Sequence, residues 1–193
     1  MVDAGGKGVS FGFWQRYRSF LGNPKNQIKL TLKLFIIRHG KAEPLAPTDL
    51  ERALAPRGIA QSRELAQRLP PPSATSLALI SPARRTLQTS ENLLAGWGLD
   101  AWPQAEVVPW GHLAPAEAWH RACGEAPPEI DTIYVIGHNP GLSEWAEAML
   151  GESGGGVFLA TAEAIEIQFD LPDWRYLARG VGSMGAWFGR SPR

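Results

Sequence analysis

The sequence has a single cysteine, Cys123, among its 193 residues, so an internal disulfide cannot form and the pattern of a small disulfide-bonded secreted protein is absent. Long apolar runs are also missing: the purely apolar stretches extend over only a few residues, as at 34–37, which is too short to cross a bilayer as a helix. The first residues lack the apolar core of a signal peptide. These absences predict a cytoplasmic protein that neither spans a membrane nor is secreted.

Neither sign of charge is in excess, because 19 Lys and Arg residues balance 19 Asp and Glu residues. The distribution is uneven, with a net charge of +7 over residues 1–41 and −7 over residues 42–193. An acidic body offers no basic face, so we expect no nucleic-acid partner. The hydrophobic share of 44% is typical of a globular domain, and a chain of this length buries enough surface to fold without a metal or disulfide.

The domain organisation follows from this asymmetry. Residues 1–28 form a basic, glycine-rich N-terminal extension, and residues 29–193 form one domain without internal repeats. An aromatic stretch at 11–21 predicts a short amphipathic turn or helix. We expect it to pack one or two aromatic rings on the domain, and contact with a membrane surface is the less favoured alternative.

Apolar periodicity predicts that strands and helices alternate from residue 29 onward. Strands are expected at 29–37, 77–80, 106–108, 132–136 and 164–169, and from 173 to the end. Helices are expected at 57–69, 83–94, 115–123 and 142–150. This alternation is typical of an α/β three-layer sandwich with a mostly parallel central sheet and helices on both faces.

Side chains that can act as nucleophiles or bind anions follow three of the expected strands. Arg38-His39-Gly40 ends the first strand, Ser81-Pro82-Ala83-Arg84-Arg85 follows the second, and Gly137-His138-Asn139 follows the fourth. Ligands bind at the carboxyl ends of the strands in open α/β sheets, so we expect two histidines and at least two arginines to converge at one edge.

This set of residue types indicates phosphoryl transfer. A neutral imidazole is a nucleophile near pH 7, since its ordinary pKa is about 6.5. A dianionic phosphoryl group repels nucleophiles until its charge is neutralised, and arginine does this with paired hydrogen bonds. Positioning and electrostatics then supply most of the rate. The other candidates for chemistry, His112, His120 and Cys123, do not complete a metal-ligand set, and we expect them to be structural or surface residues, with no metal and no cofactor.

Four segments resemble the histidine phosphatase superfamily, whose fold is phosphoglycerate-mutase-like. The segment at 34–42 resembles its R-H-G signature, the segment at 49–58 its D-x-x-R-P-L-[ST]-x-x-G motif, and the segment at 81–89 its S-P-x-x-R-x-x-Q-T motif. The segment at 134–142 is similar to the G-H-N-P-G-L form of the small SixA-type phosphohistidine phosphatases. The resemblance extends over residues 30–193.

The resemblance implies roles for individual residues. His39 is the residue that becomes phosphorylated, Arg38 and Arg85 clamp the phosphoryl group, and His138 completes the pocket. Gly40 and Asn139 join the substrate-binding set. Arg85 is preferred to Arg84, because the family spacing places the arginine three residues after the proline and neighbouring helical side chains diverge by about 100°.

One departure from the family concerns the proton donor. Many relatives carry a glutamate in an insertion, whereas only 51 residues separate Arg85 from Gly137 here and no such segment occurs. Glu43, just beyond the first strand, is a candidate but is not favoured, so the proton donor is left unassigned. Without a positioned acid, phosphohistidine, which expels an imidazole, is favoured over alkyl phosphates. The sequence therefore predicts a metal-independent phosphatase acting on a phosphohistidine-bearing protein. The alternatives are a small-molecule phosphomonoesterase and a non-catalytic module that binds phosphorylated ligands.

Overall fold

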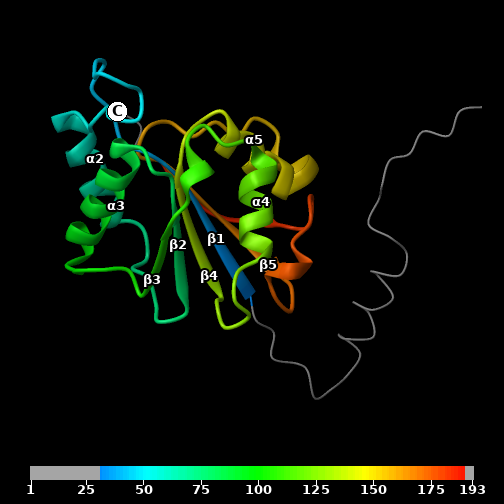
Figure 1. The fold of residues 1–193 in the computed structure, drawn as a ribbon. Helices are drawn as coiled ribbons and strands as arrows, with labels where there is room; N and C mark the ends of the chain where they lie inside the picture. The colour runs from blue at the N-terminus through cyan, green and yellow to red at the C-terminus, as the bar shows by residue number, and fades with distance from the viewer. Residues whose placement is uncertain (1–30, 190–193) are drawn as a thin grey trace, which may run out of the picture.

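A computed structural model describes residues 31–189, apart from the side chains of residues 153 and 154, and the expectations for residues 1–28 lie outside this range. One sheet has the strand order β3-β2-β4-β1-β5-β6 (Figure 1). Its strands are β1 (Thr31–Arg38), β2 (Ser76–Ile80), β3 (Gln104–Val107), β4 (Thr132–Gly137), β5 (Ala164–Asp170) and β6 (Ser183–Phe188). The helices are α2 (Pro56–Ala66), α3 (Arg84–Trp97), α4 (Ala116–Gly124) and α5 (Gly141–Leu150).

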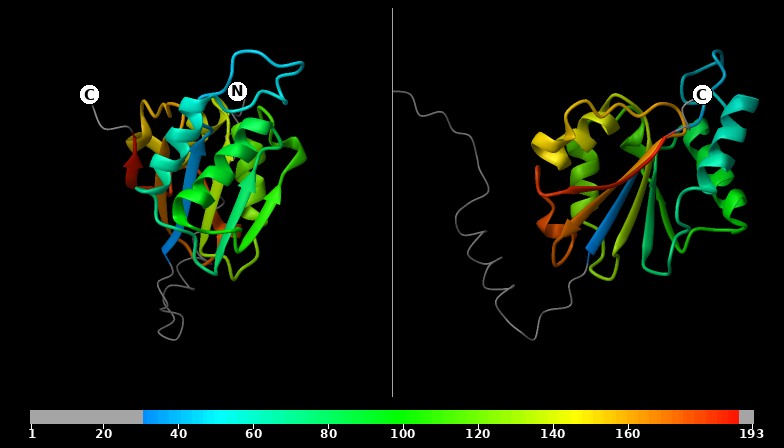
Figure 2. Two further views of the ribbon diagram at one scale, coloured as in Figure 1. Left: turned by 90° about the vertical axis from the view of Figure 1, so that its left-hand side faces the viewer. Right: turned by 180° about the vertical axis from the view of Figure 1, so that it is seen from behind.

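The sheet is parallel at its centre, because β3, β2, β4 and β1 pair in parallel while β5 runs antiparallel to both β1 and β6. Helices α4 and α5 cover one face of the sheet, and α2 and α3 cover the other (Figures 1 and 2). The three-layer α/β sandwich with helices on both faces is therefore confirmed.

The two cores follow from alternation along the buried strands. On β1, Leu34 and Ile36 pack toward α4 and α5, whereas Phe35 and Ile37 pack toward α2 and α3. Both faces of a central parallel strand are covered, which explains why its sequence is a continuous apolar run rather than an alternating one. The largest fully buried side chains on the first face are tryptophans: Trp119, Trp145 and Trp174.

The C-terminal part departs from the sequence expectation. Residues Trp174–Tyr176 form a 3-10 helix, and the last strand begins only at Ser183. The aromatic Trp174 belongs to the core, where its Nε1–H donates to the carbonyl of Ile130 at 2.8 Å. An apolar side chain that is buried by tertiary packing carries no strand periodicity of its own, so the sequence pattern was misleading there.

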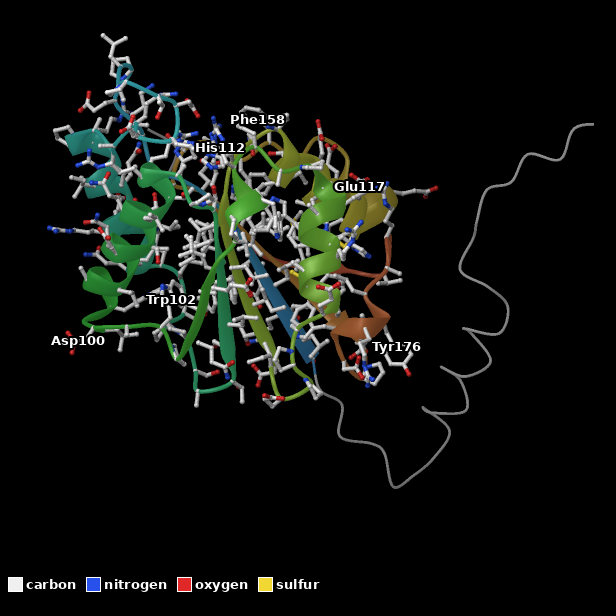
Figure 3. All side chains as sticks on the ribbon, viewed as in Figure 1. Asp100, Trp102, His112, Glu117, Phe158 and Tyr176 are labelled. Carbon is white, nitrogen blue, oxygen red and sulfur yellow. The ribbon has the colours of Figure 1, made fainter. Side chains whose placement is uncertain are left out.

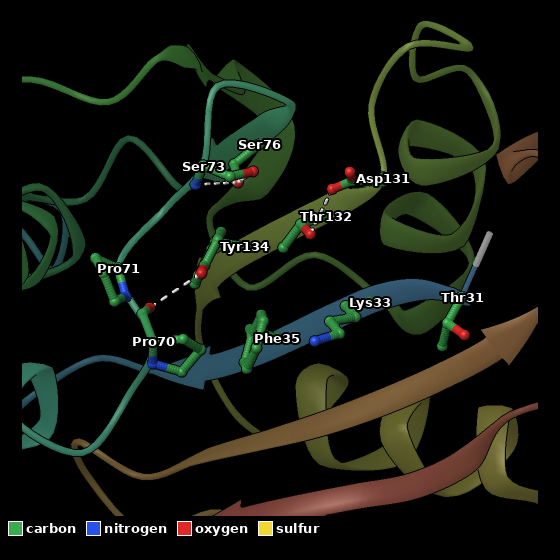
Figure 4. Close-up of a pocket in the computed structure, with 10 residues that line it drawn as sticks. All are labelled: Thr31, Lys33, Phe35, Pro70, Pro71, Ser73, Ser76, Asp131, Thr132 and Tyr134. Atoms are coloured by element: carbon green, nitrogen blue, oxygen red, sulfur yellow. Dashed lines mark hydrogen bonds between the residues drawn. The ribbon is translucent and has the colours of Figure 1, made fainter.

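Two further features of the structure lie apart from the residues predicted for catalysis. Within residues 31–189 no helix is long and apolar enough to cross a membrane. A cavity of about 290 Å³ lies at the amino ends of β1 and β4, between Lys33, Asp131 and the prolines Pro70 and Pro71 (Figure 4). None of the histidines or arginines predicted for catalysis lines this cavity.

Candidate active site

Strand register brings the three predicted segments together. Arg38 pairs with Gly137 at the end of β1 and β4, and Ile80 of β2 pairs with Ile136. The residues that follow continue the pattern: the N–H of His39 donates to the Gly137 carbonyl at 3.1 Å. His39, Ser81 and His138 therefore leave adjacent strands at the same level, as expected for a parallel sheet.

His39 is held as a neutral imidazole with a defined tautomer. Its Nδ1 lies 2.7 Å from the Gly40 carbonyl oxygen, which only accepts, so Nδ1 carries the proton and Nε2 the lone pair. Burial lowers the pKa of His39 to about 4, with smaller contributions from Arg85 and Arg38, although the hydrogen bond to Gly40 opposes the shift. At neutral pH the side chain is a nucleophile at Nε2.

Arg85 is the buried arginine of α3, and Arg84 points to solvent. Only 3% of Arg85 is exposed, and its guanidinium donates to Asp49 twice: Nη1 to the backbone carbonyl at 2.5 Å and Nη2 to Oδ2 at 2.8 Å. Thr89, one turn further along the helix, accepts from the Gly40 N–H at 3.0 Å. Helix α3 thus supplies a cation and fixes the backbone beside His39.

Arg38 projects from the end of β1 toward the segment before β5. Its Nη1 donates to the Leu159 carbonyl at 2.9 Å, and its Cζ lies 5.8 Å from the centre of the Phe158 ring, a cation–π contact. Burial lowers the pKa of Arg38, and the nearby Glu163 carboxylate opposes this effect. Its Nε is buried and has no hydrogen-bond partner among the described residues.

His138 is 4% exposed and lies beside His39, with the two ring centres 5.1 Å apart. Its Nε2 is 2.7 Å from Ser81 Oγ, while its buried Nδ1 has no partner within residues 31–189. Burial, and then the charges of His39 and Arg85, lower the pKa of His138 to about 2. His138 is therefore neutral, and a neutral ring still offers one N–H.

Gly40 and Asn139 have their polar groups bonded within the protein. The Gly40 N–H and carbonyl are taken by Thr89 and His39, and an added Cβ would lie 2.6 Å from the Gly58 carbonyl oxygen. The Asn139 amide donates to the Leu159 carbonyl at 2.9 Å and accepts from Ser143 at 3.0 Å. Both residues therefore hold His39 and the Arg38 partner in position, and the substrate contacts expected from them stay a prediction.

Three residues that the sequence did not assign to the site join it. The Asp49 carboxylate accepts from Arg52 Nη1 through Oδ1 at 2.9 Å, and its Oδ2 lies 2.7 Å from His112 Nε2. The hydrogen bond from His112, followed by the arginines, holds the pKa of Asp49 well below its usual range. The ring of His112 lies 5.4 Å from that of His138, edge to face. The D-x-x-R spacing was a signal for Asp49 and Arg52, whereas His112 had none.

No group of three or more His, Cys, Asp or Glu side chains in the described part of the chain is arranged to hold a metal ion. The cations near His39 are instead the guanidinium groups of Arg38, Arg52 and Arg85, which all act on its pKa. Such an arrangement can bind and neutralise a phosphoryl group.

Comparison with known sequences agrees with this chemistry. The sequence profile of the histidine phosphatase superfamily (branch 1) matches residues 34–111. An uncharacterized protein of Picosynechococcus sp. is 34% identical over 129 residues, which cover 64% of this chain and 76% of that protein.

Solved structures share the fold. A SixA protein from Nakamurella multipartitia superimposes with a TM-score of 0.69 at 21% identity, over 81% of this chain and 95% of that one. A protein histidine phosphatase SixA complexed with tungstate gives a TM-score of 0.60 at 24% identity, over 81% of this chain and 96% of that one. These structures show the same fold. The sequence profile and the relative from Picosynechococcus show that the chain belongs to the histidine phosphatase superfamily.

Proposed function

We propose that the protein is a metal-independent phosphatase that forms a covalent phosphohistidine at His39 and acts on phosphohistidine side chains of proteins. The observation that carries the proposal is the state of His39: a neutral ring with its proton on Nδ1 and its lone pair on Nε2, surrounded by arginines. A charged or oppositely protonated imidazole could not attack phosphorus through Nε2.

The residues around His39 perform the rest of the reaction. His39 Nε2 attacks phosphorus, the bond to the leaving group breaks, and water later attacks the phosphohistidine to release phosphate. Arg38, Arg85 and His138 neutralise or hydrogen-bond the oxygens of the phosphoryl group in both steps. Four buried polar side-chain atoms in the described region have no hydrogen-bond partner, and two of them, Arg38 Nε and His138 Nδ1, belong to this set. A bound phosphoryl group would give these two atoms a partner.

The surface around the site favours a protein substrate over a small phosphate ester. Large apolar side chains are exposed on the loops that carry site residues: Leu45, Leu50, Trp110, Leu113 and Phe158. We call these five residues the apolar rim. The labels of His112 and Phe158, at the top of the view in Figure 3, show at which end of the molecule the apolar rim lies. A sugar phosphate or phosphoglycerate presents hydroxyl or carboxylate groups and gains little from such a rim, whereas a protein surface can bury it.

The covalent step is tested by substitution and trapping. His39→Ala removes the nucleophile and is expected to abolish turnover without unfolding the protein, because His39 contributes little to either core. The wild type, quenched during turnover in EDTA, should carry one phosphate that acid releases and base does not, as for a phosphoramidate. His120→Ala, which changes a histidine on α4, is the control and should remain active. An acid-stable phosphoester or an active His39→Ala enzyme would contradict the proposal.

The substrate class is tested by comparing kcat/KM for a phosphohistidine protein with values for a sugar phosphate and 3-phosphoglycerate. We expect the protein substrate to be preferred. Leu45→Ser, which alters a rim residue that is 86% exposed, should lower the ratio of kcat/KM for the protein to that for p-nitrophenyl phosphate. Leu99→Ser, at an exposed site after α3, should leave this ratio unchanged. A preference of about tenfold or more for the alkyl esters would favour the small-molecule phosphomonoesterase instead.

A further inference from the structure

Three of the four histidines in the sequence form a row at the edge of the sheet. His138 is in the middle, with ring centres 5.1 Å from His39 and 5.4 Å from His112. His39 is the nucleophile and His138 faces the same pocket, but the reaction described so far gives His112 no task. Its side chain is partly exposed, so a bound substrate can reach it.

The backbone around His112 is built to hold the ring in place. A single 3-10 turn, Pro109–Gly111, precedes it, and the Val108 N–H donates to the Ile80 carbonyl at the end of β2. The next residue, Leu113, has a φ of 53°, a left-handed conformation that is costly for a branched side chain. Such strain persists only where the surroundings enforce it, and it is concentrated at functional sites.

Asp49 fixes the proton arrangement of His112. An ionised carboxylate only accepts hydrogen bonds, and the pKa of Asp49 lies well below its usual range, so His112 Nε2 is the donor in their 2.7 Å contact. The other ring nitrogen, Nδ1, makes no hydrogen bond with any residue that the structure describes. This Nδ1 is the atom of the pair that can give a proton to a ligand or take one from it.

The remaining carboxylates near the pocket are less suited to acid catalysis. Asp49 is ionised and bonded to two arginines and a histidine, so it has no proton to give. Glu163 accepts from the Ala160 N–H at 2.9 Å and lies near Arg38, so its carboxylate already has partners within the protein. Glu43 accepts from Arg52 Nε only through its backbone carbonyl, and among the described residues no hydrogen bond orients its side chain, in contrast to His112.

We propose that His112, oriented by Asp49, is the proton donor and acceptor of the reaction; this inference rests on the proposed function. In the first step, the N–P bond to His39 forms while the bond from phosphorus to the leaving atom breaks. The leaving atom keeps its electron pair and takes the Nδ1 proton of a doubly protonated His112, which becomes a neutral ring that still donates from Nε2 to Asp49. In the second step, a water oxygen bonds to phosphorus and gives its proton to His112, and the N–P electron pair returns to His39 Nε2. The net change is hydrolysis, with His112 restored.

A donor at this position changes the basis of substrate choice. The sequence suggested that alkyl phosphates are poor substrates because no positioned acid was found. With His112 supplying the proton, the leaving group no longer limits the range of substrates, and the preference for phosphohistidine proteins rests on the apolar rim. The family's glutamate is then replaced by a histidine–carboxylate pair that comes from two separate loops.

Leaving-group dependence tests this assignment. The variants are His112→Gln and the matched control His120→Gln, assayed as kcat/KM on p-nitrophenyl phosphate and on phenyl phosphate. p-Nitrophenolate departs without a proton, whereas phenolate is a stronger base and needs one. We expect His112→Gln to lower kcat/KM for phenyl phosphate by about 10²-fold or more, the usual size of an acid–base contribution, and for p-nitrophenyl phosphate by less than about tenfold. His120→Gln should affect neither substrate.

A second measurement does not depend on the variant folding. Across a series of substituted phenyl phosphates, the wild type should show only a shallow dependence of kcat/KM on leaving-group basicity, because the proton is supplied. Equal losses on both substrates in His112→Gln, or a steep dependence in the wild type, would overturn the assignment. In that case phosphate trapped on His39 would show that the proposed function still stands, whereas failure of the proposed function would appear as the absence of that phosphohistidine.

Discussion

At the scale of single residues, the site is defined by imidazoles kept neutral among cations. Burial dominates the lowered pKa of both His39 and His138, and neighbouring guanidinium groups lower it further. The same arginines that would neutralise a phosphoryl group therefore add to the effect of burial in keeping His39 unprotonated. Asp49 offsets part of this positive charge by pairing with Arg85 and Arg52.

This arrangement predicts how stability depends on pH. His39 and His138 have folded-state pKa values below the ordinary 6.5, so between pH 6.5 and about 4 the unfolded chain binds protons that the folded protein does not. The free energy of unfolding should therefore decrease as pH falls through this window, by up to about 1.4 kcal/mol per pH unit for each histidine. His120, whose pKa is also lowered by burial, acts in the same direction.

Urea unfolding at several pH values between 7 and 5 measures this slope, and His39→Gln should make it shallower by removing one of the contributing groups. A free energy of unfolding that is constant over this range would contradict the placement of neutral, buried histidines in the site.

At the scale of elements, the first turn of α2 locks the loop that follows His39. A Cβ on Gly58 would lie 2.0 Å from the Lys41 carbonyl oxygen, a backbone atom that cannot move aside independently. The Ala55 N–H donates to the same carbonyl at 2.8 Å, and Gln61 Oε1 accepts from the Lys41 N–H at 3.2 Å. Helix α2 therefore packs directly against the backbone that follows His39.

Gly58→Ala should consequently destabilise the protein by about 1–3 kcal/mol, as expected for overpacking, and should reduce kcat because the loop beside His39 shifts. Gly124→Ala is the matched control: a Cβ there meets only the Trp174 carbonyl oxygen at 3.8 Å. This helical glycine should gain about 0.4–1 kcal/mol from reduced entropy of the unfolded chain. Thermal unfolding and steady-state kinetics of the two variants give the comparison, and similar stabilities for both would argue against the close packing of α2.

At the scale of the whole molecule, the carboxyl ends of the parallel strands lie at one edge of the sheet, and the helices on its two faces cover the two hydrophobic cores. The catalytic candidates lie at that edge, and the cavity between Pro70 and Tyr134 lies at the other. The described domain thus contains every residue assigned to the reaction. The cytoplasmic location and the packing of the N-terminal extension stay predictions.

Removal of residues 1–27 tests how the N-terminal extension packs. A chain that starts at Ile28 should keep its kcat and change its Tm by less than about 4 °C, which corresponds to about 1 kcal/mol for a domain of this size. A larger loss in Tm would indicate that aromatic residues such as Phe13 or Trp14 complete a core. Binding of the full chain, but not of the shortened one, to anionic vesicles would favour membrane contact instead.

Local sequence patterns determined the main elements and the chemical class of the site. Apolar runs define buried strands, and the side chains of Arg38, His39 and His138 follow those strands directly, so their shared edge is a consequence of parallel pairing. Arg85 was also accessible from sequence, because the spacing of the motif that it resembles selects it over Arg84, and the 100° step between helical residues allows only one of the two to face the pocket. These predictions rest on interactions within short segments.

Only the tertiary structure decided which additional groups meet the nucleophile. Asp49 and His112 are 63 residues apart and lie in loops without periodicity, and their contact arises because β2 and β3 pair while Leu50 accepts from the Arg84 N–H. Packing likewise turned Gly40 and Asn139 toward protein partners. A hydrogen bond between distant loops depends on the placement of whole elements, which no local pattern in the sequence encodes.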